Sequence, residues 1–84
     1  MGNDIQSQTR RTLENIKAVI EASGLTMPDV VRVSVFLRNG NDFEIMDEAY
    51  KKFFPENTPT RTTVEAKLLN PDMLIEINAI ACRE

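Results

Sequence analysis

The segment VVRVSVFL, Val30 to Leu37, constrains the fold more than any other part of the chain. It is β-branched and apolar on nearly both of its faces. Such a run is typical of a strand that is covered on both sides, not of one that lies half in water. The rest of the chain must therefore supply elements that cover this strand.

An amphipathic helix is predicted before this strand, in NDIQSQTRRTLENIKAVIEASG. Asn3, with Gln6 three residues later, resembles a capping box at its start, and Gly24 supplies the left-handed residue that ends it. One face of this helix is apolar. The residues on that face are Ile5, Thr9, Leu13, Ile16, Val19 and Ile20.

A second helix is predicted after the turn NGND. Asn41 with Glu44 offers another capping box, and the segment that contains Pro55 terminates the helix. Its apolar stripe consists of Phe43, Met46, Ala49, Tyr50 and Phe53.

Two further strands are predicted, in PTRTTVEAKLL and MLIEINAIAC, joined by a turn at residues 70–72. Two strands linked by a short turn are expected to pair as an antiparallel hairpin. The element order is then α-β-α-β-β, which predicts an α+β domain with both helices on one face of a mixed sheet.

The other face of that sheet is expected to carry a mixture of polar and apolar side chains. The last strand should pack Ile75, Ile77, Ala79 and Ala81 beneath the helices. Arg61 and Thr63 are expected on the opposite face, which they share with Leu74, Glu76, Asn78, Ile80 and Cys82. Such a mixture suits a surface that another subunit covers, with polar groups gathered around a ligand.

Size and composition narrow the functional classes. The chain of 84 residues is predicted to be a single domain, residues 1–84. Folding at this length buries roughly 60–65% of the surface of the unfolded chain, which favours association with a partner.

The formal charge of −3 gives no basic field for nucleic acid. With no histidine and one cysteine, Cys82, the chain offers no tetrahedral zinc site and no internal disulfide. There is no signal-like segment and no apolar run long enough for a membrane, so the default localisation is cytoplasmic.

Three strings resemble the RidA/YjgF family of reactive-intermediate deaminases, whose name also covers proteins called endoribonuclease L-PSP. They are RRTLENIKAVIEASGL, DVVRVSVFLRNGNDFEIMDEAYKKFFPENTPTRTTVEAKLL and MLIEINAIACRE. The resemblance implies a chorismate-mutase-like fold, a cytosolic homotrimer and ligand sites between subunits. It also implies hydrolysis of 2-imino acids to 2-oxo acids and ammonia, without a metal or cofactor. Members of the family carry a strand hairpin ahead of the first helix that lines the pocket, and this segment is expected to be missing here.

Matched to the family pattern, three residues are expected in the site. Arg61 corresponds to the arginine that clamps the substrate carboxylate, and Glu76 to the glutamate near the attacking water. Thr63 falls where many members have a cysteine whose main chain contacts the ligand. Guanidinium suits the first role because its planar fork matches a carboxylate with two parallel hydrogen bonds. From the residues alone, an arginine such as Arg61 at the start of a strand is more often solvated or ion-paired than an anion clamp. Glu76 alone would be a carboxylate on the sheet surface or part of a salt bridge between subunits.

Two alternatives to a deaminase remain open from the sequence. The first is a trimeric ligand-binding or assembly module that turns over poorly because the hairpin is absent. The second is an endoribonuclease, the weakest of the three options because the chain is acidic and has no histidine. If the two last strands form a hairpin, Arg61 and Glu76 lie about 17 Å apart along it. One site would then need Arg61 from one subunit and Glu76 from its neighbour.

Overall fold

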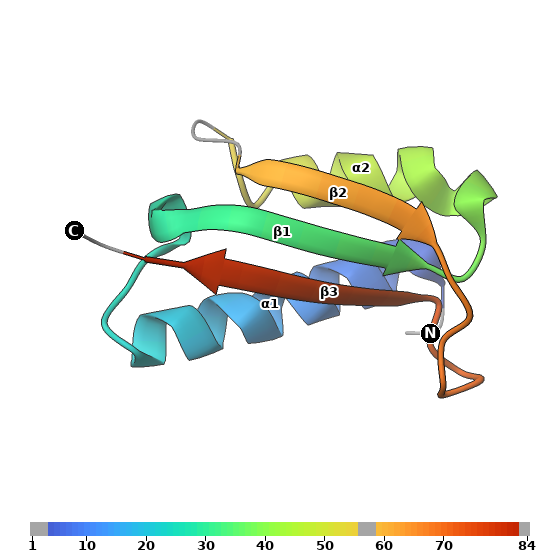
Figure 1. The fold of residues 1–84 in the computed structure, drawn as a ribbon, viewed down its shortest axis with the longest axis horizontal. Coiled ribbons are helices and arrows are strands. Elements are labelled where there is room, and N and C mark those ends of the chain that lie inside the picture. The colour runs from blue at the N-terminus through green and yellow to red at the C-terminus, as the bar shows by residue number, and fades with distance from the viewer. Residues whose placement is uncertain (1–3, 56–58, 83–84) are drawn as a thin grey trace.

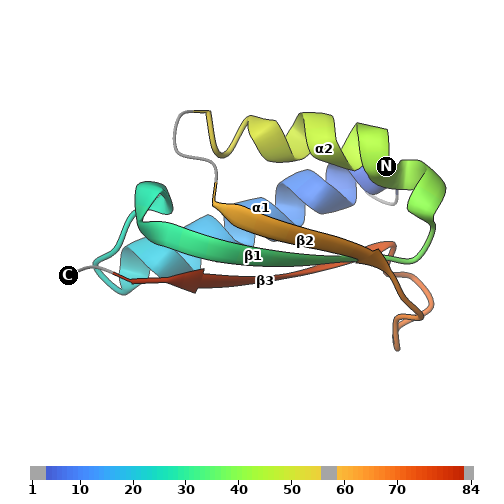
Figure 2. The same cartoon turned by 45° about the horizontal axis from the view of Figure 1, so that its top comes forward.

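The computed structural model describes residues 4–55 and 59–82. The elements are α1 (Ile5–Ala22), β1 (Val30–Leu37), α2 (Phe43–Lys51), β2 (Thr60–Glu65) and β3 (Ile75–Ala81), with short 3₁₀ turns at Met27–Asp29 and Gly40–Asp42. Both helices lie on one face of a three-stranded sheet (Figure 1, Figure 2). The predicted α+β order, with the helices on one side of a mixed sheet, is confirmed.

Strand β1 occupies the centre of the sheet, between β2 and β3. It pairs with β2 in parallel and with β3 antiparallel, as Figure 1 shows. The predicted hairpin between the last two strands is therefore wrong. In the centre of the sheet, the most apolar strand has a neighbouring strand on each side. Its side chains are then better covered than they would be at an edge of the sheet.

The segment after β2 crosses the end of β1 instead of turning back on β2. Arg38 holds it there, because its guanidinium donates hydrogen bonds to the carbonyl oxygens of Leu68 (3.1 Å), Asn70 (2.7 Å) and Met73 (2.8 Å). The backbone N–H of Arg38 also donates to Leu74 O at 3.0 Å. A buried carbonyl needs such a partner when it has no strand to pair with. Arg38 thereby directs the chain to the far side of β1.

The hydrophobic core lies between the sheet and the two helices. On β1, Val33, Val35 and Leu37 are buried beneath the helices. The other large side chains that are fully buried are Leu13, Met46, Tyr50 and Ile75. The predicted inward placement of Ile75 and Ile77 is confirmed.

The helix ends differ in part from the prediction. Helix α1 is capped by Asp4, whose Oδ1 accepts a hydrogen bond from Ser7 N at 2.7 Å, while Asn3 of the predicted capping box lies outside the described residues. Gly24 has the expected left-handed conformation, with φ of 85°.

The predicted start and end of the second helix are both wrong. The 3₁₀ turn Gly40–Asp42, capped by Asn39, takes up Asn41 of the expected capping box, so α2 begins at Phe43 and Glu44 lies in its first turn. The helix ends at Lys51, before Pro55. Neither helix within the described ranges is both long enough and apolar enough to cross a bilayer.

Candidate functional site

Arg61 lies on the helix-covered face of the sheet. It is level with Val33 of β1, whose side chain is completely buried, and side chains of residues paired in this way point to the same face. The expectation that Arg61 and Thr63 share a face with Glu76 is therefore wrong. Because β2 is an edge strand, Arg61 can lay its aliphatic stem against α2 and carry its charge to the rim of the domain.

Two aromatic rings and a carboxylate of α2 hold the guanidinium of Arg61. Its central carbon lies 4.6 Å from the ring centre of Tyr50 and 5.4 Å from that of Phe43, within the range of cation–π attraction. Its Nη1 donates a hydrogen bond of 2.6 Å to Oδ1 of Asp47. The side chains of Arg61 and Asp47 are only 21% and 19% exposed. The pair is thus partly desolvated, and the position of the guanidinium is well defined.

Asp47 is bound by two cations. Lys51, one helical turn further on, places its Nζ 3.2 Å from Oδ2 of Asp47. Burial acts to raise the pKa of Asp47, but the hydrogen bonds from Arg61 and Lys51 outweigh it, so that the pKa lies below its ordinary value. Asp47 is consequently a carboxylate at neutral pH.

A cavity of about 610 Å³ opens beside this pair. Its lining residues are Asp47, Tyr50, Lys51, Phe54, Pro55 and Arg61. Two cations and one carboxylate give the lining a net charge of +1, which suits a monoanionic ligand. Aromatic walls with a few polar groups are typical of small-molecule sites.

Two hydroxyl groups, one on a lining residue and one on the strand that carries Arg61, are buried without a hydrogen-bond partner among the described residues. They are Tyr50 Oη, on a residue that lines the cavity, and Thr63 Oγ1, on the same strand face as Arg61. Burial raises the pKa of Tyr50, so its hydroxyl remains a proton donor at neutral pH. Buried polar atoms usually have partners. These two atoms therefore mark capacity for further hydrogen bonds beside Arg61.

Glu76 lies on the opposite, open face of the sheet, as predicted. It is level with Phe36 of β1 and is exposed to solvent. Arg61 is level with Val33, three residues along the same strand, so the offset along the sheet is about 10 Å, with β1 standing between the two. One chain does not bring Arg61 and Glu76 together. The predicted distance of about 17 Å between Arg61 and Glu76 is wrong, because it assumed a hairpin. The prediction that one chain keeps the two residues apart holds for a different reason: they lie on opposite faces of the sheet.

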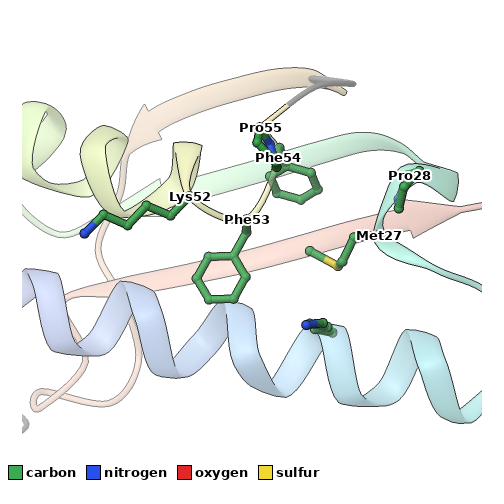
Figure 3. A pocket seen from close by; sticks show the side chains of 7 residues that line it. Met27, Pro28, Lys52, Phe53, Phe54 and Pro55 are labelled. Carbon is green, nitrogen blue, oxygen red and sulfur yellow. The ribbon is translucent and has the colours of Figure 1, made fainter.

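A second cavity, of about 410 Å³, lies between α1, the turn at Met27–Asp29 and the end of α2. Figure 3 shows Phe53 extending toward α1 and Met27 facing the same hollow, while Lys52 points away. It contains none of the predicted site residues. Its walls are mainly apolar, so it offers packing surface but few groups that could take part in a reaction.

Sequence reasoning missed Asp47. The signal was present, because Phe43, Asp47 and Tyr50 are spaced at i, i+4 and i+7 and so lie along one side of α2. A carboxylate at the edge of an apolar stripe requires a cationic partner when the helix is packed. For metal binding, residues 4–55 and 59–82 contain no group of three or more histidine, cysteine, aspartate or glutamate side chains that could hold an ion.

Fold and site together define a small α+β domain in which an ion-paired arginine lines a cavity on the helical side of the sheet. The family model described as endoribonuclease L-PSP matches residues 1–83. The chain belongs to this family, which is also known as the RidA/YjgF family.

Similar proteins agree with this assignment. A RutC family protein of Pyrococcus horikoshii is 51% identical over 81 residues, which cover 96% of this chain and 64% of that protein. A 2-iminobutanoate/2-iminopropanoate deaminase of Salmonella typhimurium is 42% identical over 86 residues, 99% of this chain and 67% of that one. The solved structure of Escherichia coli TdcF with bound serine superposes with a TM-score of 0.90 at 43% identity, covering 96% of this chain and 66% of that one. The chain thus spans about two thirds of the length of these relatives.

Proposed function

We propose that the chain contributes to a site that hydrolyses 2-imino acids to 2-oxo acids and ammonia. In this proposal Arg61 binds the substrate carboxylate, the main chain at Thr63 contacts the ligand, and Glu76 orients the attacking water. The observation that carries it is the guanidinium of Arg61, which is partly desolvated and held at a cavity whose lining has a net charge of +1. The name of the Salmonella relative, 2-iminobutanoate/2-iminopropanoate deaminase, supports the reaction class.

The reaction requires few protein groups. Water adds to the carbon of the protonated imine while Glu76 accepts a proton from that water, giving a tetrahedral carbinolamine. The carboxyl of Glu76 returns the proton to nitrogen and the C–N bond breaks. As the C=O bond forms, the hydroxyl of the carbinolamine gives its proton back to the Glu76 carboxylate, which passes it to the departing ammonia, so that ammonium is released. A positioned carboxylate in such a role is worth typically 10²–10⁴-fold in rate.

A site that uses both residues has to be built from two chains. Arg61 and Glu76 lie on opposite faces of the sheet and on strands separated by β1. The open face also carries apolar side chains that water does not favour, with Val64 43% and Ile80 56% exposed. A homotrimer in which the open face of one subunit meets the next would cover these side chains and bring Glu76 to the Arg61 of a neighbour.

An imine-hydrolysis assay tests the proposal. An amino-acid oxidase supplies a short-lived 2-imino acid, and release of ammonia is measured with and without the chain. The chain should accelerate release above the blank, and Arg61→Lys should raise KM about tenfold or more, because a point charge cannot reproduce the fork. Arg11→Lys, at an exposed position of α1, is the matched control. Activity indifferent to Arg61→Lys would remove Arg61 from the site.

Subunit complementation tests the shared site. Arg61→Ala and Glu76→Ala chains are denatured, mixed and refolded, and the mixture is assayed against each variant refolded alone. Mixed trimers should recover a fraction of the activity, because some interfaces then carry both intact residues. Mixtures that stay as inactive as the separate variants would show that each site uses a single chain.

A trimeric ligand-binding or assembly module is the alternative function. It is favoured by the same observation that demands two chains, since one chain carries Arg61 and Glu76 on opposite faces of its sheet and does not bring them together. A chain that binds 2-oxo acids but does not accelerate imine hydrolysis would support this alternative over the deaminase. An endoribonuclease, named in the family description, is disfavoured by the net charge of −3, which repels a phosphate backbone.

A further inference from the structure

We infer that the free edge of β3 is a self-association surface, on which the β3 strand of a second copy of this chain pairs antiparallel. The contact joins the two sheets edge to edge. It is distinct from the open face of the sheet that a trimer would cover, and it does not depend on the reaction proposed for Arg61 and Glu76.

Alternate residues of β3 direct their backbone groups toward β1 or away from the sheet. The strand forms the margin of the sheet on the side away from β2 (Figure 1). Arg38 N donates to Leu74 O at 3.0 Å, and these residues stand opposite each other in the register of β1 and β3, so they form a hydrogen-bonded pair. Such pairs alternate with non-hydrogen-bonded ones along an antiparallel ladder. Asn78 therefore directs its N–H and C=O toward β1, whereas Ile77 and Ala79 direct theirs outward.

The outward backbone groups of β3 lack partners. Cys82 N donates to Asp29 O at 3.0 Å, so Ala81 faces outward as well. Among residues 4–55 and 59–82, no hydrogen bond occupies the outward groups of Ile77, Ala79 and Ala81. The strand, IEINAIA, has no proline or lysine, which are devices that keep sheet edges apart. Its edge can therefore accept another extended backbone.

An uncharged groove runs beside this edge. It is a cavity of about 320 Å³ between α1 and β3. Its lining residues are Thr12, Asn15, Ile16, Val19, Ile20 and Ala79. None of them is charged, although 27% of the chain is, and the apolar side chain of Val19 is 67% exposed. A partner at the edge of β3 would thus cover apolar surface in addition to pairing its backbone.

The symmetry of such a contact favours a second copy as the partner. A two-fold axis perpendicular to the sheet makes the two β3 strands antiparallel and places both α1 helices on one face, next to each other. One contact then satisfies both free edges and covers Val19 in each copy. A surface that meets its own copy brings like charges together, and a groove without charged side chains avoids that repulsion.

The number of chains per particle tests the inference. In the full 84-residue chain, Val19→Lys places an ammonium in the groove of both copies, and Ala79→Pro removes an outward N–H while it spares the hydrogen bonds to β1. Either change should halve the particle mass measured by light scattering at equal chain concentration, whether or not the open faces form a trimer. Ala18→Lys, at an exposed neighbouring position of α1 outside the groove, should leave the mass unchanged.

Amide hydrogen exchange gives a second readout, which needs no substitution. In the wild type, the N–H groups of Ala79 and Ala81 should exchange about tenfold or more slowly at high chain concentration than after dilution, because the second strand protects them. Asn78 is the internal control, since its N–H faces Ser34 of β1 and should stay protected at both concentrations. In the Val19→Lys chain, Ala79 and Ala81 should exchange rapidly at either concentration.

Several results would overturn the inference. A wild type with the same mass as the Val19→Lys chain would show that the groove does not join copies, and a mass halved equally by Ala18→Lys would deny the groove any special role. Exchange of Ala79 and Ala81 that is fast at every concentration would show a free edge. Protection that persists on dilution would mean that the same chain covers its own edge. If Ala79→Pro fails to fold, Val19→Lys and the wild-type exchange still decide.

Discussion

Replacing Glu76 by glutamine is expected to lower kcat for imine hydrolysis by about 10²–10⁴-fold. Glutamine keeps the shape of the side chain and its hydrogen-bonding capacity, but it cannot take a proton from water. Because Glu76 is exposed on the open face of the sheet, the substitution should leave the fold unchanged. KM should change little, since the proposed carboxylate contact belongs to Arg61. The measurement is the steady-state rate of ammonia release at saturating imine.

Glu65→Gln is the matched control for this prediction. Glu65 is also a carboxylate at the edge of the sheet, but it serves the backbone, accepting a hydrogen bond from Gly40 N at 2.9 Å. Its replacement should leave kcat within a few-fold of the wild type. A Glu76→Gln chain that retains its full rate would exclude Glu76 as the group that orients water.

Replacing Leu13 by alanine is expected to lower the free energy of unfolding by about 2–5 kcal/mol. Leu13 is 1% exposed and faces the sheet from the middle of α1, so the truncation leaves a cavity that its neighbours can fill only in part. A domain of this size has a total stability of only about 5–15 kcal/mol, and the loss would be a large share of it. Urea titration followed by circular dichroism measures the change.

Leu69→Ala makes the identical chemical change at a site that is fully exposed. It should alter the free energy of unfolding by less than about 0.5 kcal/mol. If both variants lose the same stability, the burial of Leu13 is not what stabilises α1 against the sheet. A Leu13→Ala loss below about 1 kcal/mol would also contradict the prediction, because it lies outside the range for buried leucines.

The element order could be predicted from the sequence, because amphipathic periodicity and turn residues are local signals. The bounds of β1 were predicted to the residue, since its β-branched run is enclosed by Pro28 and the turn at residues 39–42. Strand pairing could not be predicted in the same way. It depends on Arg38 binding the carbonyl oxygens of the segment after β2, a contact between residues about thirty positions apart.

The site could be predicted only in part, for a related reason. Alternate residues of β2 form two sets, one with Arg61 and Thr63 and the other with Thr62 and Val64. Because both sets contain threonine, the alternation of polar and apolar residues does not show which set faces the helices. Contact with Asp47 and Tyr50 decides it, because α2 offers Arg61 a counter-ion and an aromatic surface that the open face lacks. Arg61 could be selected as a candidate site residue from the sequence. The face of the sheet to which its side chain points could not, because that depends on how α2 packs against β2.

The central position of β1 also governs how the chain can reach its native state. Among the three strands that the structure describes, no two neighbours are joined by a tight turn, because β2 and β3 flank β1 instead of pairing with each other. Each pairing of these three strands must therefore overcome the entropy of closing a long loop before its hydrogen bonds form, and they contain no hairpin that could serve as a nucleus. During synthesis on the ribosome, β1 has to wait for the C-terminal strand before its antiparallel edge is satisfied. Until then, the most apolar strand of the chain is open to association with other nascent chains.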